Sequence, residues 1–410
     1  MMLTSNSFER SKKTGSMRRV AKYIRKKFSS EDHFNATGPT TRPPIVIRQS
    51  NLEDDYTICE ELGRGKFGFV KRIKRISTNE QFAAKWIKIN EKTKNNVLEE
   101  IKIMEKLDSK RVIKLHNVYE TSKSYILVME FVTGGELFER IASEETVTEK
   151  ECVHYMRQLL EGLQYIHRMN IVHLDLKPEN IVCVSKYSWN IKLIDFGLAK
   201  ELKPGTIVKT MQGTPEFVAP EIINYDPIHL ASDMWSVGVI AYILVSGLSP
   251  FLGDDDNDTL TNVTAGTYDF EDEAFMNVGH EVKDFIEKLL QKSPRKRKTA
   301  EECLKHEWIK KNKGKGRIPT ENLRKFIVQK KWQKSVNAVR AVHKFSSINS
   351  LSNIGAKTKS QSVLKLNVEA TFSAKPRPLS DRNRDLSRSV PSVFSIDEGQ
   401  FNKRHDDFRE

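Results

Sequence analysis

The stretch HLDLKPEN, residues 173–180, decides which fold this chain is expected to adopt. It brings a carboxylate (Asp175), an ammonium group (Lys177) and a side-chain amide (Asn180) close together in the sequence. A carboxylate can accept the proton of an attacking hydroxyl, a lysine can neutralise a phosphoryl group during its transfer, and an amide oxygen can bind a metal ion. The spacing therefore predicts a site for phosphoryl transfer, in which Asp175 and Lys177 are catalytic and Asn180 holds a metal.

A glycine-rich segment lies well upstream of this stretch. In GRGKFGFV, residues 63–70, the glycines Gly63, Gly65 and Gly68 have GxGxxG spacing, and Val70 follows them. Glycines let backbone N–H groups approach phosphate oxygens without an intervening side chain. By itself the pattern also fits a dinucleotide-binding turn. Here a strand rather than a helix is predicted to follow, which favours a hairpin that covers the phosphates of ATP.

Lys85, in the segment AAKWIK, is a second phosphate-binding candidate because it lies on a predicted strand soon after the glycines. A lysine there can reach the α- and β-phosphates if a carboxylate holds it in place. The apolar spacing of NNVLEEIKIMEKL predicts a helix that carries two candidates for this carboxylate, Glu99 and Glu100. Glu100 is the better one because it shares a helix face with Met104 and Leu107.

Two further motifs complete the set. DFG at residues 195–197 supplies Asp195, a hard oxygen ligand for a Mg²⁺ ion that bridges phosphates, and APE follows at 219–221. All these motifs stand in the order and spacing of the protein kinase family, which residues 55–310 resemble. The resemblance implies an α+β fold of two lobes, a small β-rich N-lobe with one helix and a larger α-helical C-lobe, with ATP and Mg²⁺ bound between them.

The resemblance also implies roles for residues around the substrate. Thr214, in GTPEF, is similar to the serine/threonine-kinase residue that contacts the catalytic acid and lysine, which favours Ser or Thr as the acceptor. Glu136 and Glu179 resemble substrate-binding positions that recognise Arg or Lys; the alternative is that both are plain solvated acids. Glu221 is expected to form a structural ion pair with Arg297. The residues expected to bind or enclose ATP are Leu62, Gly63, Gly65, Gly68, Val70, Ala83, Lys85, Glu100, Met129, Glu130, Val132 and Ile194.

Leu174 departs from a common pattern of the family. Many kinases carry an arginine directly before the catalytic aspartate, and this arginine binds a phosphorylated residue of the activation loop and orders that loop. Leucine cannot form that ion pair. We therefore expect an activity that does not depend on phosphorylation of Thr206 or Thr210, and a control element elsewhere in the chain.

Residues 322–345, NLRKFIVQKKWQKSVNAVRAVHKF, are the candidate for that element. On a helix, Trp332, Val336, Val339 and Phe345 form one apolar stripe with basic residues beside it, as in the targets of calmodulin. We expect the basic segment before and within this helix to cover the substrate groove, and Ca²⁺-loaded calmodulin to remove it. The alternatives are a helix that only packs on the kinase and a helix that lies on a membrane surface.

Charge is divided unevenly along the 410 residues. The net charge is +14, yet residues 51–310 contain 35 Lys/Arg against 42 Asp/Glu, so an acidic body lies between basic flanks. The predicted organisation is a basic, mostly disordered tail (1–50), the kinase domain (51–310), an autoinhibitory and calmodulin-binding segment (311–348) and a disordered tail (349–410). Within the first tail, MRRVAKYIRKKF is predicted to be either a docking helix or a solvated basic segment.

Other features bear on location and partners. The chain has no apolar run long enough to span a membrane and no secretory signal at its N-terminus, and its four scattered cysteines favour a reducing environment. We therefore expect a cytoplasmic monomer. No nucleic-acid partner is expected, since basic charge without interleaved aromatic residues is weak support for one.

The chain resembles the myosin light chain kinases, above all the smooth-muscle and non-muscle type, in HLDLKPEN, GTPEFVAPE, SDMWSVGVIAYILVSGLSPF and KKWQKSVNAVRAVHKFSS. The implied substrate is a Ser or Thr in a basic stretch of myosin regulatory light chain, and the implied partners are calmodulin and the actomyosin cytoskeleton. The death-associated protein kinases share HLDLKPEN and are the alternative, although the Lys85–Glu100 interval is too short for the basic insert that would favour them. The intact Lys85, Asp175, Asn180 and Asp195 argue against a scaffold without activity.

Overall fold

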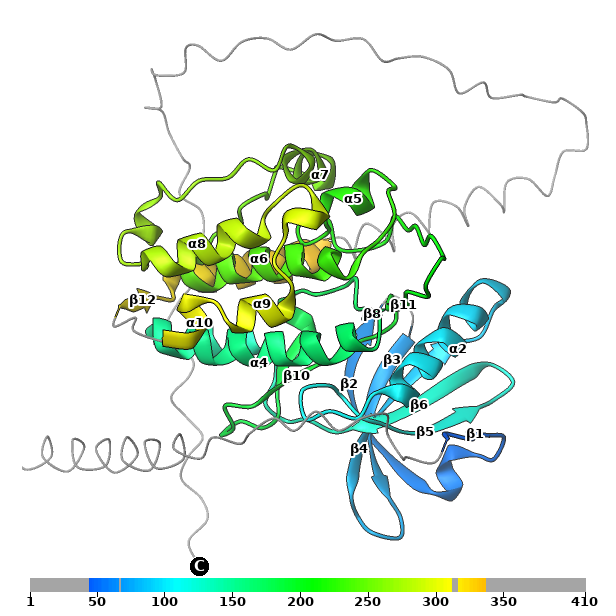
Figure 1. Ribbon diagram of the computed structural model, residues 1–410. Helices are drawn as coiled ribbons and strands as arrows, with labels where there is room; N and C mark the ends of the chain where they lie inside the picture. Colours follow the sequence, from blue (N-terminus) through cyan, green and yellow to red (C-terminus); the bar gives the residue numbers. More distant parts are fainter. Residues whose placement is uncertain (1–43, 66–67, 312–315, 337–410) are drawn as a thin grey trace, which may run out of the picture. The chain divides into compact units, whose positions relative to one another are not determined.

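The computed structural model describes residues 44–65, 68–311 and 316–336. Within these ranges the chain forms two lobes, a sheet with one helix and a larger helical lobe, as Figure 1 shows and as the sequence predicted. Residues 17–28, Val339, Phe345 and residues 349–410 lie outside the described residues, so the predictions made for them stay predictions.

The N-lobe is built on a six-stranded sheet in the order β1-β5-β6-β4-β3-β2. The glycine-rich segment is the turn of the β2–β3 hairpin, as predicted, and Gly65 is paired with Gly68 across it. Neighbouring strands are antiparallel except that β1 pairs parallel with β5. The strands are β1 (Ile47–Arg48), β2 (Tyr56–Gly65), β3 (Gly68–Arg75), β4 (Gln81–Lys88), β5 (Leu115–Glu120) and β6 (Ser124–Glu130).

The N-lobe helix, α2 (Glu91–Lys106), begins several residues before the predicted apolar pattern. It buries Val97, Ile101 and Met104, and Leu107 just beyond its end completes the buried stripe, whereas Leu98 is only partly buried. Leu98 and Leu107 both fit a helical period with Val97, Ile101 and Met104, so the sequence by itself does not choose between them. Packing decides for Leu107, which lies on the face turned toward the core.

Two long helices form the centre of the C-lobe. Helix α4 (Glu149–Arg168) begins with a capping box between Thr148 and Glu151, and it buries one face. Helix α6 (Leu230–Ser246) is buried along nearly its whole length, so its sequence is apolar without a clear stripe. The other elements from here to the end are α3 (Leu137–Ala142), β7 (Thr146–Thr148), β8 (Ile171–Val172), η2 (Pro178–Asn180), β9 (Ile181–Cys183), β10 (Ile191–Leu193), β11 (Lys200–Glu201), α5 (Pro220–Ile223), α7 (Asp256–Ala265), η3 (Glu273–Phe275), α8 (His280–Leu289), η4 (Pro294–Lys296), α9 (Ala300–Leu304), α10 (Glu307–Lys311) and β12 (Arg317–Pro319).

The segment after the kinase body packs against the C-lobe. Strand β12 pairs antiparallel with β7, and residues 321–336, called the tail helix below, are helical (orange in Figure 1). Leu323 and Phe326 of the tail helix are buried in the main core. Gly247, which caps α6 with a φ of 70°, lies so close to the backbone at Asn322 and Leu323 that a Cβ would collide with it.

The N-terminal boundary differs from the predicted one. Residues 44–50 were assigned to the basic tail, but β1 lies within them and extends the sheet. A strand of two residues has no period that a sequence can display, so only the folded structure shows it. Among the described residues, no helix has the length and hydropathy needed to cross a membrane.

Candidate active site

Sheet register gathers four of the predicted ATP-binding residues on one face of the N-lobe. Val70 lies opposite Lys85 in the β3–β4 ladder, and Ala83 lies opposite Met129 in the β4–β6 ladder. Residues directly opposite each other share a face, as do residues two apart in one strand. Since Ala83 and Lys85 are two apart, the four side chains project from the same face of the sheet.

The three glycines of the hairpin have different surroundings. No atom lies within 4 Å of the place where a Cβ would stand at Gly63 or Gly65, so a phosphate can approach the backbone there. At Gly68 a Cβ would collide with the carbonyl of Trp86 on β4. Gly68 is therefore required for the packing of β3 on β4. Leu62, beside these glycines in β2, is half-exposed.

The connection between the lobes contains the residues expected to bind adenine. The N–H of Glu130 donates to the carbonyl of Lys114 at 2.9 Å, and the carboxylate of Glu130 lies 3.0 Å from Lys192 Nζ. The N–H of Glu130 is therefore already paired and is not available to adenine. Val132, two residues later, is half-buried and packs against the core.

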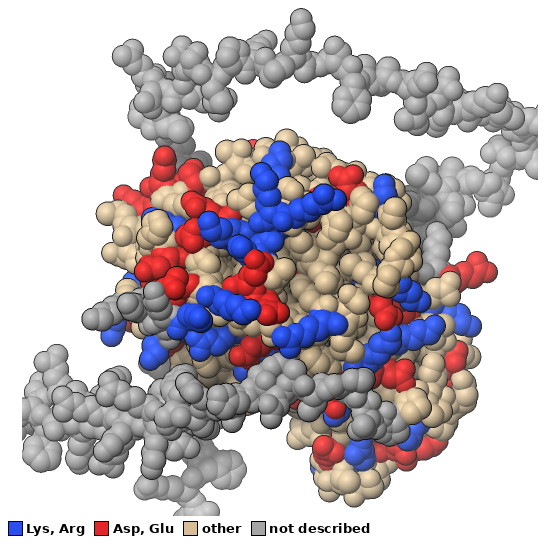
Figure 2. Space-filling model, viewed as in Figure 1, with Lys and Arg blue, Asp and Glu red and all other residues tan. Residues whose placement is uncertain are grey.

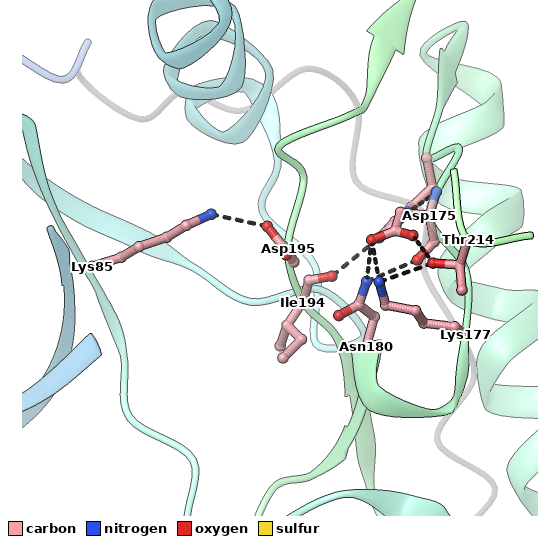
Figure 3. A network of polar contacts seen from close by, with 8 residues as sticks. Lys85, Asp175, Lys177, Asn180, Ile194, Asp195 and Thr214 are labelled. Carbon is pink, nitrogen blue, oxygen red and sulfur yellow. Dashed lines mark hydrogen bonds and ion pairs between the residues drawn. The ribbon is translucent and has the colours of Figure 1, made fainter. Parts of the chain in front are cut away.

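Lys85 is held by two carboxylates from different lobes. Its Nζ lies 2.8 Å from Glu100 Oε1. It also lies 2.9 Å from Asp195 Oδ1, a contact that Figure 3 shows. Burial alone would lower the pKa of Lys85, but Glu100 and Asp195 outweigh that effect and raise the pKa. Burial would raise the pKa of Asp195, but the Lys85 ammonium lowers it overall. Both groups therefore carry their charges at neutral pH.

Asp175 is the centre of a hydrogen-bond network in the catalytic stretch. Its Oδ2 accepts from Lys177 Nζ at 2.7 Å and from Asn180 Nδ2 at 3.1 Å, and its Oδ1 accepts from Thr214 Oγ1 at 2.9 Å (Figure 3). Lys177 Nζ also donates to Thr214 Oγ1 at 3.2 Å. The fold thus brings together the four residues that the sequence predicted here, and it holds the carboxylate of Asp175 in one orientation.

Asp233, in the first turn of α6, supports the backbone of this stretch. Its carboxylate is buried and accepts from the N–H groups of His173 and Leu174 at 2.8 and 2.9 Å and from His167 Nε2 at 2.9 Å. Leu174 has a φ of 66°, a conformation that leucine rarely adopts. Asp233 stabilises that conformation. Sequence reasoning missed this residue because nothing in the linear pattern links α6 to HLDLKPEN.

Asp195 and Asn180 are the residues that fit a divalent metal. The amide nitrogen of Asn180 donates to the carbonyl of Asp175 at 2.8 Å as well as to its carboxylate, so the amide oxygen is the atom left for a metal. Mg²⁺ is commonly held by one or two protein oxygens together with phosphates and waters. The described residues include no cluster of three or more His, Cys, Asp or Glu side chains that could hold a metal ion.

Two ion pairs join α2 to the segment that follows DFG. Lys200 Nζ of β11 lies 2.5 Å from Glu99 Oε2, and Lys106 Nζ lies 2.7 Å from Glu201 Oε2. The pairs are reciprocal, since each element supplies one acid and one base. They link the activation segment to α2 without a phosphate and without an arginine at position 174. Glu99, the rejected candidate for Lys85, has this role instead.

The predicted structural ion pair in the C-lobe is present. Arg297 donates to both carboxylate oxygens of Glu221 at 2.7 Å, and both side chains are buried. Ser232 Oγ donates to Glu221 as well, at 2.7 Å. Because the charges are paired and further hydrogen-bonded, this pair connects the APE motif to the helices beneath it.

The tail helix lies over the acids predicted to bind substrate. A cavity of about 400 Å³ remains between the tail helix and the C-lobe. Glu136 at the start of α3, Glu179 in η2 and Thr214 line it from the kinase side, and Lys330 and Lys334 line it from the tail side. Figure 2 shows acidic and basic side chains interspersed over both lobes on the face that it presents.

Tail lysines pair with carboxylates of the groove. Lys330 forms an ion pair with Glu216, which is only 2% exposed, and Lys331 Nζ lies 2.5 Å from Glu139 Oε1. Glu216 and Glu139 were missed by sequence reasoning, although the acid in GTPEF was a visible signal. Burial, then Glu139 and Glu179, raise the pKa of Glu136, while the tail lysines oppose that rise.

The opposite face of the tail helix is exposed. Trp332 is 69% exposed and Val328 is 66% exposed, whereas Leu323 and Phe326 are buried. Val336, the other described member of the predicted apolar stripe, is half-exposed. The inward and outward faces of this helix thus carry different residues.

The family follows from this geometry and from a direct comparison. The family model described as "Protein kinase domain" matches residues 56–309. The chain belongs to the protein kinase family, which in general uses ATP and a divalent metal, and the site described above is its candidate active site. Among curated proteins it is 46% identical over 338 residues to "Myosin light chain kinase, smooth muscle" from Gallus gallus, which covers 81% of this chain but 18% of that protein.

Other relatives indicate which group of protein kinases the chain belongs to. The chain is 44% identical over 309 residues to "Death-associated protein kinase 2" from Homo sapiens, covering 72% of this chain and 84% of that protein. Among solved structures, the twitchin kinase fragment from C. elegans, titled an autoregulated protein kinase, is 41% identical with a TM-score of 0.67, covering 72% of this chain and 67% of that chain. The protein is therefore a serine/threonine protein kinase of the group that contains myosin light chain, death-associated and twitchin kinases.

Proposed function

We propose that this kinase transfers the γ-phosphate of Mg²⁺-bound ATP to a serine or threonine in a basic stretch of myosin regulatory light chain. We propose further that its tail inhibits it and that Ca²⁺-loaded calmodulin activates it. The observation that carries the proposal is the ion pair between Lys330 and the buried Glu216, because it sets a basic side chain of the tail in the acid-lined groove.

The catalytic residues act by position and charge. Asp175, oriented by Asn180 and Thr214, accepts the proton of the attacking hydroxyl. Lys177, within reach of both Asp175 and Thr214, neutralises charge on the phosphoryl group that moves. Asp195 and Asn180 would hold the metal, which would offset the charge of the phosphates.

The acid-lined groove selects a basic substrate. Glu136, Glu139, Glu179 and Glu216 supply four carboxylates along one path, and three of them border the cavity. The tail lysines occupy this path as a basic peptide would, so substrate and tail compete for the same charges. The resemblance to the myosin light chain kinases implies a substrate whose Ser or Thr lies in a basic stretch of myosin regulatory light chain. We therefore propose this light chain as the substrate.

Calmodulin can engage the tail helix before it leaves the groove. Trp332, the largest predicted anchor, points away from the kinase body and is 69% exposed. Calmodulin targets bind as amphipathic helices through such anchors. Binding of Trp332 by calmodulin then shifts the equilibrium toward the state in which the tail helix has left the groove. Only in that state can calmodulin contact the whole helix. The proposed location is the cytoplasm, on or near actomyosin.

The test is transfer of labelled phosphate from ATP to purified myosin regulatory light chain, with Ca²⁺–calmodulin and with chelator. We expect transfer only with calmodulin in the full chain. In Trp332→Ala we expect the inhibited state to persist and activation to be lost, because this exposed side chain supports calmodulin binding and not the packing of the tail. Gln329→Ala, also on an exposed position of the helix, is the control and should behave like the parent.

A second candidate, a death-associated-type kinase with another substrate, has one observation in its favour. The chain is 44% identical to human death-associated protein kinase 2, nearly as high as its 46% identity to the smooth-muscle relative. The two candidates share the active site and differ in substrate. If the chain phosphorylates a generic basic peptide under calmodulin control but not the light chain, the second candidate replaces the first.

A further inference from the structure

Residues 44–55 make contacts with α2 that none of the roles above explains. They precede the residues matched by the kinase family model, which begin at 56, and they contain β1 and the short helix η1 (Leu52–Asp54). Strand β1 extends the sheet at its edge, with Ile47 opposite Val118. We call residues 44–55 the N-terminal strap.

The first residues of the strap contact α2. The backbone N–H of Ile45 donates to Glu105 Oε1 at 2.6 Å. The side chains of Ile45 and Ile47 are partly buried against the main core cluster, to which Ile101 and Met104 of α2 also belong. A hydrogen bond to a charged acceptor is among the stronger kinds in proteins. The strap therefore holds the helix through this hydrogen bond, while its apolar side chains fix it to the common core.

The other end of the strap is fixed to the sheet. Asp55 Oδ2 accepts from Arg48 NH1 at 2.8 Å and from Tyr119 Oη at 2.5 Å. Between them, Gln49 Nε2 donates to Glu120 Oε2 at 2.9 Å. Tyr119 and Glu120 belong to β5, so these contacts tie the strap to the strand that it pairs with. A segment anchored this way can resist movement of the helix that it touches.

We propose that the N-terminal strap is a positioning element for the kinase reaction, acting through Glu105 to keep α2 where Glu100 meets Lys85. Glu100 and Glu105 are five positions apart, which places them about 140° apart around the helix. Helix α2 is thus held on one side by Lys85 and on another by the strap. Without the strap contact α2 can turn or shift, and Lys85 loses the carboxylate that aims it at the ATP phosphates.

The proposal concerns ATP binding, so it is tested without reference to the light chain or to calmodulin. In the full chain, the Kd for a fluorescent ATP analogue with Mg²⁺ is measured for Glu105→Ala and Ile45→Pro, the second of which removes the N–H donor. We expect each to weaken binding about threefold to tenfold. Glu105→Gln, which keeps an acceptor oxygen, and Lys102→Ala, at an exposed position of α2, should stay within about twofold of the parent.

A double variant distinguishes positioning from general stability. Because both single changes remove the same contact, Glu105→Ala combined with Ile45→Pro should bind the analogue no more weakly than the weaker single variant. Unchanged Kd in both single variants, or a lower thermal midpoint with unchanged Kd, would overturn the proposal and leave the contact purely structural. Should Glu105→Ala not fold, Ile45→Pro compared with Glu105→Gln tests the same contact by the same measurement.

Discussion

The ATP-facing site and the substrate groove of this kinase satisfy their charges in opposite ways. In the ATP-facing site, Lys85 pairs with Glu100 and Asp175 pairs with Lys177, so the partners belong to the kinase body itself. In the groove, buried Glu216 pairs with Lys330 of the tail helix. The charges of the ATP-facing site are paired without the tail helix, whereas Glu216 of the substrate groove is paired with a lysine of the tail helix.

This difference supports the proposed control by the tail. The predicted catalytic residues are paired within the kinase body, while the tail helix lies over the groove that we propose as the path of the substrate. A kinase whose activation loop needed a phosphate would show the reverse, with an open groove and a site not yet assembled. Leu174 fits the first arrangement, because the loop is already linked to α2 through Glu99–Lys200 and Lys106–Glu201.

The largest effect is expected inside the ATP-facing site. Asp175→Asn removes the proton acceptor while an amide of similar shape keeps the local structure, so kcat for a basic peptide should fall about a thousandfold. KM for ATP should change little. Asp108→Asn, at an exposed site paired with Lys114, is the control. A fall in kcat of less than tenfold would show that Asp175 is not the proton acceptor and that the ATP-facing site does not act as its geometry indicates.

The next effect separates the groove from the ATP-facing site. Lys330→Glu leaves Glu216 buried beside a like charge, and breaking a buried pair costs about 3 kcal/mol or more. The tail should leave the groove, and activity without Ca²⁺–calmodulin should rise at least about tenfold, with kcat in the presence of calmodulin unchanged. Lys325→Glu, an exposed change on the same helix, serves as the control. If Lys330→Glu remains as inactive as the parent without calmodulin, the ion pair between Lys330 and Glu216 does not inhibit the kinase.

A smaller effect tests how the loop is held in the absence of an arginine at position 174. Lys200→Glu places like charges on α2 and β11, and because the pair is partly exposed, kcat/KM should fall only about twofold to fivefold. Glu99→Lys should have a similar effect. The swapped double variant should recover most of the loss, and rates measured for all four proteins form a double-mutant cycle. Purely additive losses would mean that the pair does not couple the two elements.

The smallest effect is expected in the activation loop. Thr206→Ala and Thr210→Ala, singly or together, should change calmodulin-stimulated activity by less than about twofold, because no arginine at position 174 is available to bind a phosphate there. The measurement is initial rate before and after phosphatase treatment of the parent and the variants. A large loss of activity in either threonine variant would show that the activation loop controls the kinase. The contrast between the ATP-facing site and the substrate groove would then no longer hold.

Much of the active site was predictable because its residues lie in short, local motifs of the sequence. Asp175, Lys177 and Asn180 come from one turn of chain, so their types and spacing already imply that they converge. The choice of Glu100 over Glu99 also followed from a local rule, the face of one helix. The fold followed from the same residues once the family was recognised, and the strands and helices carry ordinary periodic patterns.

Partners that lie far apart in the sequence could not be read in this way. Glu216 and Lys330 were each visible as charged residues, but nothing in their neighbours said that one would be buried beneath the other. The same holds for Asp233 beneath HLDLKPEN and for Glu105 against Ile45. These contacts depend on where whole elements lie in space, which no periodicity of one segment encodes.

The sequence by itself determined that this chain is a protein kinase with an intact set of catalytic residues and a basic, amphipathic tail. Those conclusions depend on residue types within short segments, where the backbone permits few arrangements. Only the tertiary structure decided that the tail helix turns its lysines into the groove and Trp332 outward, and that Ile45, which precedes β1, donates a hydrogen bond to Glu105 of α2. The physical reason is that burial and charge pairing are properties of several elements packed together, not of any one of them.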